Sequence, residues 1–326
     1  MNVVAVGGGT GLSTLLRGLK REVGESIKKL TAIVTVADSG GSTGRIRKIY
    51  NIPAPGDIRN CIVALSDSEE IMQDLFQYRF RGEGLEGHAF GNLFLTAMTE
   101  ITGSFLEAVK ITSKILRTRG EIIPSTVSDV HLVARFSDGS VVEGEESITE
   151  YGKEKDVRIE DIWIEPRNAQ APIDAIGSIE TADLILFGPG SLFTSIIPNM
   201  LIEGIRSAVA RSTALKVFIV NAMTQPGETD GFTAYDHYRT FLRFSGLEKV
   251  DAVVINTKMP PSGLLKRYLE QGQEPVVPDV GRIAKEGPSV YAEDLIGDQE
   301  NFVRHDPDRL TDLILRIAQD EILSGI

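Results

Sequence analysis

The hydrophobic pattern of the chain predicts buried parallel strands that alternate with helices in both halves. Near-continuous apolar runs, rich in Val and Ile, occupy residues 2–6, 30–37, 182–187, 215–220 and 250–256. Runs of this kind are typical of strands covered on both faces. Apolar residues at helical spacing fill much of the chain between the second and third runs, and also residues 12–22 and 306–323. We therefore predict an α/β fold with a Rossmann-like, doubly wound, mostly parallel sheet.

A different pattern occupies residues 120–166. Two β-type runs flank Asp138-Gly139, which is a strong hairpin signal, and residues 157–164 alternate between apolar and charged positions. We predict a small antiparallel β insert at about 120–166. The rest of the pattern continues on both sides of it, so we expect one domain that spans residues 1–326.

Four predicted strands end in glycine-rich or polar loops. Ligands of open parallel sheets bind beyond the carboxyl ends of the strands, and successive backbone N–H groups in such loops can hold an anion. Each loop alone could be a plain turn, but together they favour one shared crevice for a phosphate-bearing ligand. The candidate residues of these loops are Gly8, Gly9, Thr10, Gly11, Leu12, Asp38, Gly40, Gly41, Ser42, Arg45, Gly188, Gly190, Ser191, Thr194, Asn221, Thr224, Gln225, Glu228 and Thr229.

The first loop matches neither standard phosphate-binding motif. Leu12 stands where the dinucleotide motif needs its third glycine, and Leu12-Ser13 stands where a P-loop needs Gly-Lys. Asp38, at the end of the second strand, lies farther beyond Gly11 than the roughly 20 residues usual for a ribose-binding acid. The missing glycine at position 12 and the large distance in sequence to Asp38 both disfavour an NAD-dependent oxidoreductase.

Further candidates lie near predicted helices. GDIRN supplies Asp57, Arg59 and Asn60, and GHAFGN supplies His88 and Asn92. Capping, solvation or packing is the plainer interpretation of each. Two late residues are also candidates. Tyr268 could stack on a base or simply pack, and Arg304 could pair with a diphosphate or lie on the surface.

Composition and charge restrict the classes of partner. The net charge of −12, from 34 basic and 46 acidic residues, opposes a large nucleic-acid interface, which needs a basic face. Cys61 is the single cysteine, so a reducing, cytoplasmic compartment is expected. No run of about 18 apolar residues predicts a membrane span, and no Cys/His spacing predicts a zinc site.

Six motifs together resemble the bacterial gluconeogenesis factor family (YvcK-like), within the wider CofD-like family. They are AVGGGTGLSTLLRGLK, TVADSGGSTGRIR, GDIRNCIVALSD, GHAFGNLFL, FGPGSLFTSIIPN and NAMTQPGETDGF. The resemblance covers nearly the whole chain. It implies a cytoplasmic protein that binds UDP-sugars, notably UDP-N-acetylglucosamine, and is required for cell shape and growth on gluconeogenic carbon sources. It also implies that the glycine loops, Tyr268 and Arg304 contact the nucleotide sugar.

One further interpretation stays open beside a UDP-sugar-binding regulator that requires no cofactor. The CofD branch implies a transferase that moves a phospholactyl group from a nucleotide-linked donor with Mg²⁺, for which Asp38 and Asp57 would hold the metal. No nucleophile–base pair stands out by spacing, which favours the regulator. A homo-oligomer and further protein partners are compatible with the sequence.

Overall fold

The seven strands of the main sheet are parallel and come from both halves of the chain. The structure is a computed structural model that describes residues 1–297 and 301–324. Across the sheet the order is β10 (Ser289–Glu293), β9 (Ala252–Asn256), β8 (Leu215–Ile219), β7 (Leu184–Phe187), β1 (Asn2–Gly7), β2 (Lys29–Val34) and β3 (Glu121–Pro124). The chain builds outward from β1 to β3 and then, from β7, in the opposite direction. The predicted fold class is confirmed, and a topological switch point lies between β1 and β7.

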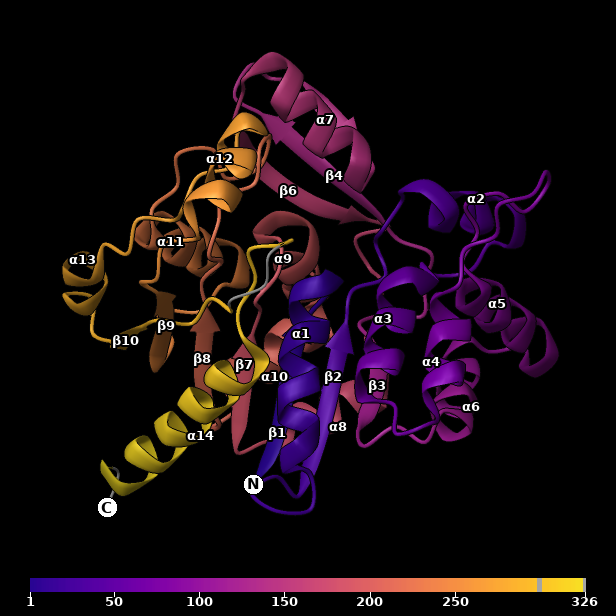
Figure 1. Ribbon diagram of the computed structural model, residues 1–326, viewed down its shortest axis with the longest axis horizontal. Coiled ribbons are helices and arrows are strands. Elements are labelled where there is room, and N and C mark those ends of the chain that lie inside the picture. Colours follow the sequence, from indigo (N-terminus) through magenta and orange to yellow (C-terminus); the bar gives the residue numbers. More distant parts are fainter. Residues whose placement is uncertain (298–300, 325–326) are drawn as a thin grey trace.

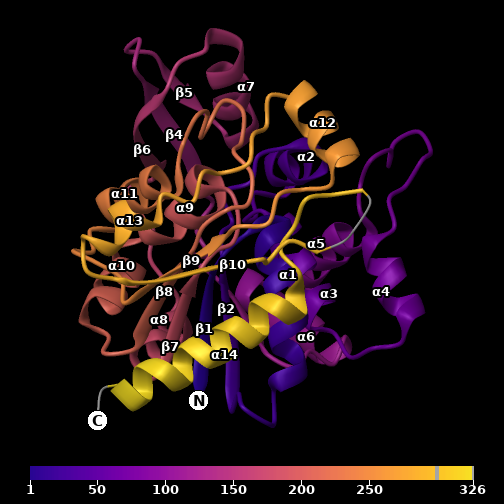
Figure 2. The same cartoon turned by 60° about the vertical axis from the view of Figure 1, so that its left-hand side comes forward.

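Helices cover both faces of this sheet (Figures 1 and 2). One layer includes α1 (Gly9–Leu19), α3 (Pro55–Leu65) and α14 (Pro307–Ser324), and the other includes α8 (Ile173–Glu180), α10 (Glu203–Arg211) and α11 (Ala234–Ser245). The backbone N–H groups of Asp308 and Arg309 donate to Asp306 Oδ1 (both 3.0 Å), so Asp306 caps α14. The remaining helical segments are Lys20–Glu22, α2 (Gly41–Tyr50), α4 (Glu70–Gln77), α5 (Phe90–Thr102), α6 (Phe105–Ile115), α7 (Glu145–Lys155), Leu192–Ile196, α9 (Ile197–Met200), α12 (Ser262–Glu270) and α13 (Val280–Ala284).

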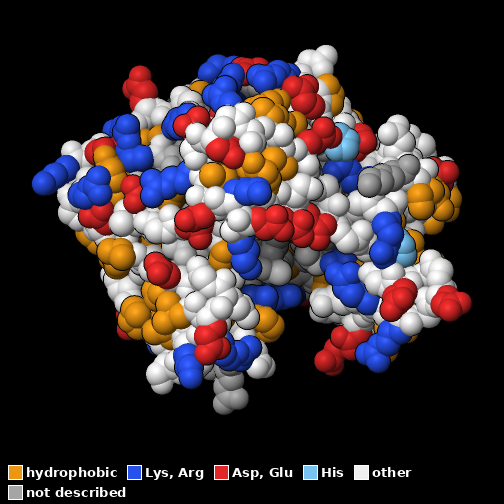
Figure 3. All heavy atoms as spheres, turned by 90° about the horizontal axis from the view of Figure 1, so that it is seen from above, with side chains coloured by type: hydrophobic (Ala, Val, Ile, Leu, Met, Phe, Trp, Pro, Cys, Tyr) orange, Lys and Arg blue, Asp and Glu red, His pale blue; other side chains and the backbone are white. Residues whose placement is uncertain are grey.

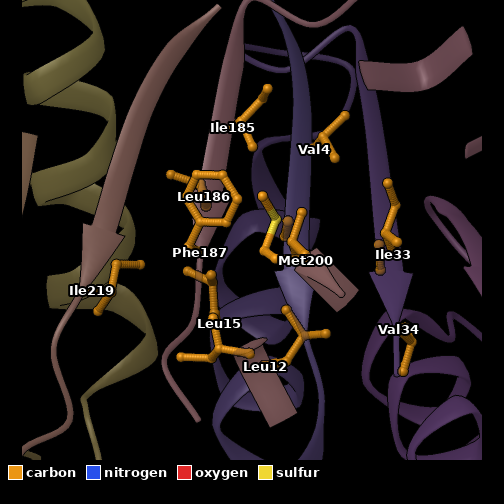
Figure 4. Close-up of a cluster of buried hydrophobic side chains, with 14 of the residues drawn as sticks. Val4, Leu12, Leu15, Ile33, Val34, Ile185, Leu186, Phe187, Met200 and Ile219 are labelled. Carbon is orange, nitrogen blue, oxygen red and sulfur yellow. The ribbon is translucent and has the colours of Figure 1, made fainter. Parts of the chain in front are cut away.

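The main core lies between the sheet and its helices. Figure 4 shows Val4, Ile33 and Phe187 from three adjacent strands, and Leu12 and Leu15 of α1, among the buried side chains of the core. All five side chains are at most 2% exposed. Phe187 faces α11, with its ring 4.9 Å from that of Phe241, whereas Gly7 faces α1, since a Cβ there would lie 3.6 Å from Leu12 Cβ. This packing fixes the start of α1 directly above the end of β1, which positions the first glycine loop.

The antiparallel insert is smaller than the sequence predicted. It contains β5 (Val141–Glu143), β4 (His131–Phe136) and β6 (Ile159–Glu165), and the Asp138-Gly139 hairpin is confirmed. Residues 121–124, which we assigned to the insert, instead form β3 at the edge of the parallel sheet. A strand of four residues is too short to show whether one face or both are buried, so its pattern alone could not place it.

The insert also carries a helix, α7, that the sequence analysis did not separate from the β-type runs. In both ribbon views the insert and α7 lie above the C-terminal ends of the parallel strands (Figures 1 and 2). This is the end of the sheet to which all four loops belong.

Candidate functional site

A cleft of about 260 Å³ lies at the C-terminal ends of β1, β7 and β8. It brings together three of the four predicted loops with Tyr268 and Arg304, which are far away in the sequence. We call it the strand-end cleft. Its lining residues are Thr10, Gly11, Thr14, Pro189, Gly190, Ser191, Asn221, Ala222, Met223, Thr224, Gln225, Tyr268, Gln273, Phe302, Val303, Arg304 and His305.

The first and third loops touch through their backbones. A Cβ atom at Gly11 would lie 2.4 Å from the carbonyl oxygen of Pro189, closer than real Cβ atoms approach other heavy atoms. Only glycine lets α1 begin this close to the third loop. The N–H of Gly190 in turn donates to Asn221 Oδ1 (3.0 Å), which joins the fourth loop to the third. The floor of the strand-end cleft is therefore rigid backbone from three strand ends.

Tyr268 supports residues 302–305, a segment that also lines the cleft. The Tyr268 hydroxyl accepts a hydrogen bond from the backbone N–H of Val303 (3.0 Å), and the residue packs against a small apolar cluster that includes Met223 and Leu264. The guanidinium of Arg304 lies 4.6 Å from the centre of the Phe302 ring, a cation–π contact. Tyr268 thus packs against the protein and also lines the cleft, so neither sequence-based interpretation excludes the other.

His305 is buried beside Arg304 and faces the cleft as a neutral group. Its exposure is 6%, and burial lowers its pKa from 6.5 to about 4. Among the described residues, its Nε2 atom has no hydrogen-bond partner. A cation on this ring at neutral pH would be unfavourable, so the positive charge at this end of the cleft comes from arginine.

Four carboxylates gather next to the cleft. We call Asp38, Asp57, Glu145 and Glu228 the carboxylate cluster. Burial, followed by the charge of Asp38, raises the pKa of Asp57 from 3.8 to about 6. Burial and the charges of the other three members raise the pKa of Glu145 well above its ordinary value. At neutral pH these groups therefore oppose one another's ionisation, which favours either protons or a cationic partner.

The first glycine loop joins the carboxylate cluster to the cleft. A Cβ at Gly8 would lie 2.5 Å from Asp57 Oδ2, and the N–H of Gly9 hydrogen-bonds Asp57. Glu228 is 7% exposed and accepts hydrogen bonds from Ser191 and from Thr149 Oγ1, the latter at 3.0 Å. Because Thr149 belongs to α7, the insert contributes directly to the cluster. Burial also raises the pKa of Glu228.

Other predicted residues form a third group, beyond the carboxylate cluster. Arg59 donates to Asn92 Oδ1 (3.1 Å) and to Asn60 Oδ1 (2.7 Å), and Ser42 Oγ is 3.0 Å from Nδ1 of His88. Burial, together with the charge of Arg79, lowers the pKa of Arg59 to about 10. Arg45 donates to the carbonyl oxygen of Glu86 (2.7 Å). These residues contact one another rather than the strand-end cleft, so the predicted single crevice is in fact divided.

Two of the predicted ligand-binding residues have fully buried side chains. Leu12 is fully buried in the main core (Figure 4) and can reach a ligand only through its backbone. Thr229 is also fully buried, and its hydroxyl accepts the N–H of Gln225 (2.9 Å), so it shapes the fourth loop. Sequence reasoning in turn missed Glu145. It lies in an acidic run of the insert that looks like an ordinary solvated surface, and only the folded chain brings it to Asp38.

Figure 3 looks onto this end of the molecule. A hollow near the centre has acidic side chains along one side and basic side chains along another. The described part of the chain contains no group of three or more His, Cys, Asp or Glu residues arranged to hold a metal. Within the same residues, no helix is both long enough and apolar enough to cross a membrane.

A larger cavity of about 700 Å³ lies near the N-terminal ends of β2 and β3. Lys29, Lys110, Lys114 and Ile173 are among its lining residues. The largest cavity is ordinarily the first candidate for a ligand site. Here, however, none of the predicted loops reaches it, so the strand-end cleft is the better candidate.

Comparison with known proteins gives consistent results. A family described as 2-phospho-L-lactate transferase CofD matches residues 3–296. The "Putative gluconeogenesis factor" of Aquifex aeolicus is 70% identical over 100% of this chain and 99% of its own length. The "Gluconeogenesis factor" of Bacillus subtilis is 42% identical over 98% of each chain. A crystal structure of a Bacillus halodurans protein, 42% identical, superposes with a TM-score of 0.92 over 96% of this chain and 99% of the other.

Proposed function

The chain belongs to the CofD-like family that includes the bacterial gluconeogenesis factors, and on that premise we propose that it is a cytoplasmic regulatory protein that binds a UDP-sugar in the strand-end cleft. Its ligand would be UDP-N-acetylglucosamine, and its roles would be in cell morphogenesis and in growth on gluconeogenic carbon sources. The observation that carries the proposal is the convergence of three loops, Tyr268 and Arg304 on one cleft.

The chemistry of the cleft suits the parts of a nucleotide sugar. Tyr268 offers a ring face for a base, and Arg304 offers a cation for a phosphate. Asn221 and Gln225 offer amide groups for hydroxyls of a ribose or a sugar. The cavity is slightly smaller than the roughly 300–1,000 Å³ typical of ligand sites. We therefore expect the sugar to extend out of the cleft along the strand ends.

The carboxylate cluster favours one alternative, a transferase of the CofD type. Mg²⁺ is commonly held by one or two carboxylates together with substrate phosphates. Asp38 and Asp57 fit that description, since a Cβ at Gly56 would lie 3.0 Å from Asp38 Oδ2 and the two charges influence each other. In this alternative both side chains would hold the metal, which supplies charge neutralisation at the phosphates when bound. The surrounding carboxylates would then be ionised.

Calorimetric titration with UDP-N-acetylglucosamine, with and without Mg²⁺, tests the proposal. Chromatography of the ligand afterwards shows whether it is intact, and GDP and NAD serve as controls. We expect binding without metal and an intact ligand. Binding of GDP alone with Mg²⁺, or breakdown of the nucleotide donor, would contradict the regulator and support the transferase.

Arg304→Glu provides the matching variant. Reversing the charge at the cleft should weaken UDP-N-acetylglucosamine binding by about 10-fold or more, because a charge-assisted hydrogen bond contributes roughly 1.5–3 kcal/mol. Arg316→Glu, which reverses an exposed arginine on α14 paired with Glu293, is the control and should bind as the parent does. Unchanged affinity in Arg304→Glu would remove Arg304 from the site.

A further inference from the structure

Arg17 lies on the side of α1 that faces the strand-end cleft. Thr10 and Thr14 of this helix line the cleft. Arg17 follows Thr10 by seven residues, which leaves it only about 20° away around the helix axis. Arg17 is exposed, lies in the last turn of α1 and is not itself a lining residue of the cleft. Side chains of a helix lean toward its N-terminus, so the long side chain of Arg17 can reach back toward Thr14. In the sequence, Arg17 is simply one polar position of the predicted helix 12–22.

The packing of α1 on α14 brings Arg17 close to Arg304. A Cβ at Gly18 would lie 2.3 Å from the carbonyl oxygen of Pro307 and 2.2 Å from Thr311 Oγ1. The start of α14, three residues after Arg304, therefore touches α1 next to Arg17. The electrostatics agree, since burial and the charge of Arg304 both lower the pKa of Arg17.

Among the residues that the structure describes, neither arginine has an acidic partner. Within residues 1–297 and 301–324, no carboxylate forms an ion pair with Arg17 or with Arg304, and Arg304 only stacks on Phe302. By contrast, Arg21, in the short helical segment Lys20–Glu22 that follows α1, pairs with Asp308. In a chain of net charge −12, two neighbouring cations that no described carboxylate pairs with are unusual, because acidic residues outnumber basic ones. Their mutual repulsion is relieved when an anion lies between them.

We propose that Arg17 and Arg304 form a two-arginine clamp for a diphosphate group at the end of the strand-end cleft. The inference rests on the proposed nucleotide-sugar function and assigns the position of the diphosphate within it. Guanidinium groups bind phosphate oxygens through paired N–H donors, and two of them can each engage one phosphate. The N-terminus of α1 adds its positive dipole on the same side. A diphosphate should therefore bind more tightly than a monophosphate.

The test compares Arg17→Gln with Arg21→Gln in calorimetric titrations of the full chain. The probes are UDP-N-acetylglucosamine, UMP and inorganic pyrophosphate. We expect Arg17→Gln to weaken both diphosphate probes about 10-fold or more and to reduce the salt dependence of binding, while UMP changes much less. Arg21→Gln, whose native partner is Asp308, should match the parent with all three probes. Equal melting temperatures of the two variants would show that the change is not one of folding.

The outcomes separate the clamp from the function on which it rests. Suppose that the parent binds pyrophosphate but no UDP-sugar, and that Arg17→Gln weakens pyrophosphate binding. This result would support the clamp and overturn the nucleotide-sugar proposal. If the parent binds the UDP-sugar and Arg17→Gln binds it equally well, the clamp is overturned and the proposed nucleotide-sugar function still stands. Failure of the parent to bind either diphosphate probe would overturn both. An Arg17→Gln/Arg304→Gln variant should lose less than the sum of the single changes, because both side chains hold one group.

Discussion

The strand-end cleft and the carboxylate cluster are neighbours at the same end of the sheet, yet they carry opposite charge. The cleft is lined by Arg304, which has no ion pair within the described residues, and by a neutral His305. In the cluster, the pKa values of Asp57, Glu145 and Glu228 are raised, and the charge of Asp38 contributes to the first two of these shifts. Both arrangements cost stability in the free protein, which is a common property of functional sites.

Under the proposed function, this difference leads us to expect separate parts of the ligand in the two regions. A diphosphate would be favoured in the cleft, because the carboxylate cluster would repel it. A sugar that extends from the cleft would meet the hydrogen-bond acceptors of the cluster, where carboxylates commonly bind hydroxyl groups. The first glycine loop touches both regions through Gly8 and Gly11. Changes at these glycines and at single members of each region therefore test the comparison.

The largest effect is expected from Gly11→Ala. The added Cβ would lie 2.4 Å from the Pro189 carbonyl oxygen, and backbone cannot move aside as a flexible side chain can. Separation of α1 from the third loop should reduce UDP-sugar affinity about 100-fold and destabilise the fold by roughly 1–3 kcal/mol. Calorimetry and urea unfolding measure the two effects.

Gly263→Ala is the matched control. It lies in α12, and a Cβ there meets nothing within 4 Å. Its affinity should equal that of the parent, and its stability should stay the same or increase slightly. If Gly11→Ala bound the ligand as Gly263→Ala does, the strand-end cleft would not be the ligand site.

A smaller effect, confined to the carboxylate cluster, is expected from Asp57→Asn. Because the pKa of Asp57 rises from 3.8 to about 6 on folding, the folded chain binds more protons than the unfolded chain between these values. The parent therefore loses stability as the pH rises from about 4 to 6, and the variant avoids that loss. We expect Asp57→Asn to be more stable than the parent by roughly 1–3 kcal/mol at pH 7.5 and little different at pH 4.

Asp138→Asn tests the sign of that argument. Hydrogen bonds from the backbone of Ser140 and from Tyr151 lower the pKa of Asp138, so ionised Asp138 stabilises the folded state above the unfolded pKa. This variant should be less stable than the parent at pH 7.5. If Asp57→Asn and Asp138→Asn both lost stability at pH 7.5, ionised Asp57 would stabilise the folded state. The carboxylate cluster would then not be the unfavourable arrangement that distinguishes it from the cleft.

The sequence predicted most of the fold and the loops of the site because both depend on local patterns. Continuous apolar runs identify buried strands, and glycines directly after them identify the ligand-binding end of the sheet. The division of the crevice was not predictable. Arg59, Asn60 and Asn92 look like ligand contacts in sequence, but only their folded distances show that they bind one another. Arg17 carries a periodic signal, since it lies seven residues after Thr10, but its proximity to Arg304 depends on how α14 packs.

The missed strands have a similar explanation. β10 (Ser289–Glu293) has partly buried and exposed residues, so it lacks the apolar run that marks its neighbours. β3 pairs with β2 across about 90 residues of sequence, and no local pattern records such a partner. Glu145 joins the carboxylate cluster only because α7 lies over the strand ends. The residues that could not be predicted from the sequence are therefore those whose roles depend on packing between distant parts of the chain.

The smallest effect is expected from Tyr268→Phe, which keeps the ring and removes the acceptor for the Val303 N–H. Loss of one hydrogen bond to the segment that carries Arg304 should cost about 0.5–1.5 kcal/mol in ligand binding. Tyr268→Ala removes the ring too and should lose a further 1–3 kcal/mol or so if a base stacks there. Calorimetry with UDP-N-acetylglucosamine and with pyrophosphate distinguishes the two roles. Stacking affects only the nucleotide, whereas displacement of Arg304 weakens both ligands. Equal losses for both probes in Tyr268→Ala would make Tyr268 a support for the arginine rather than a contact for the base.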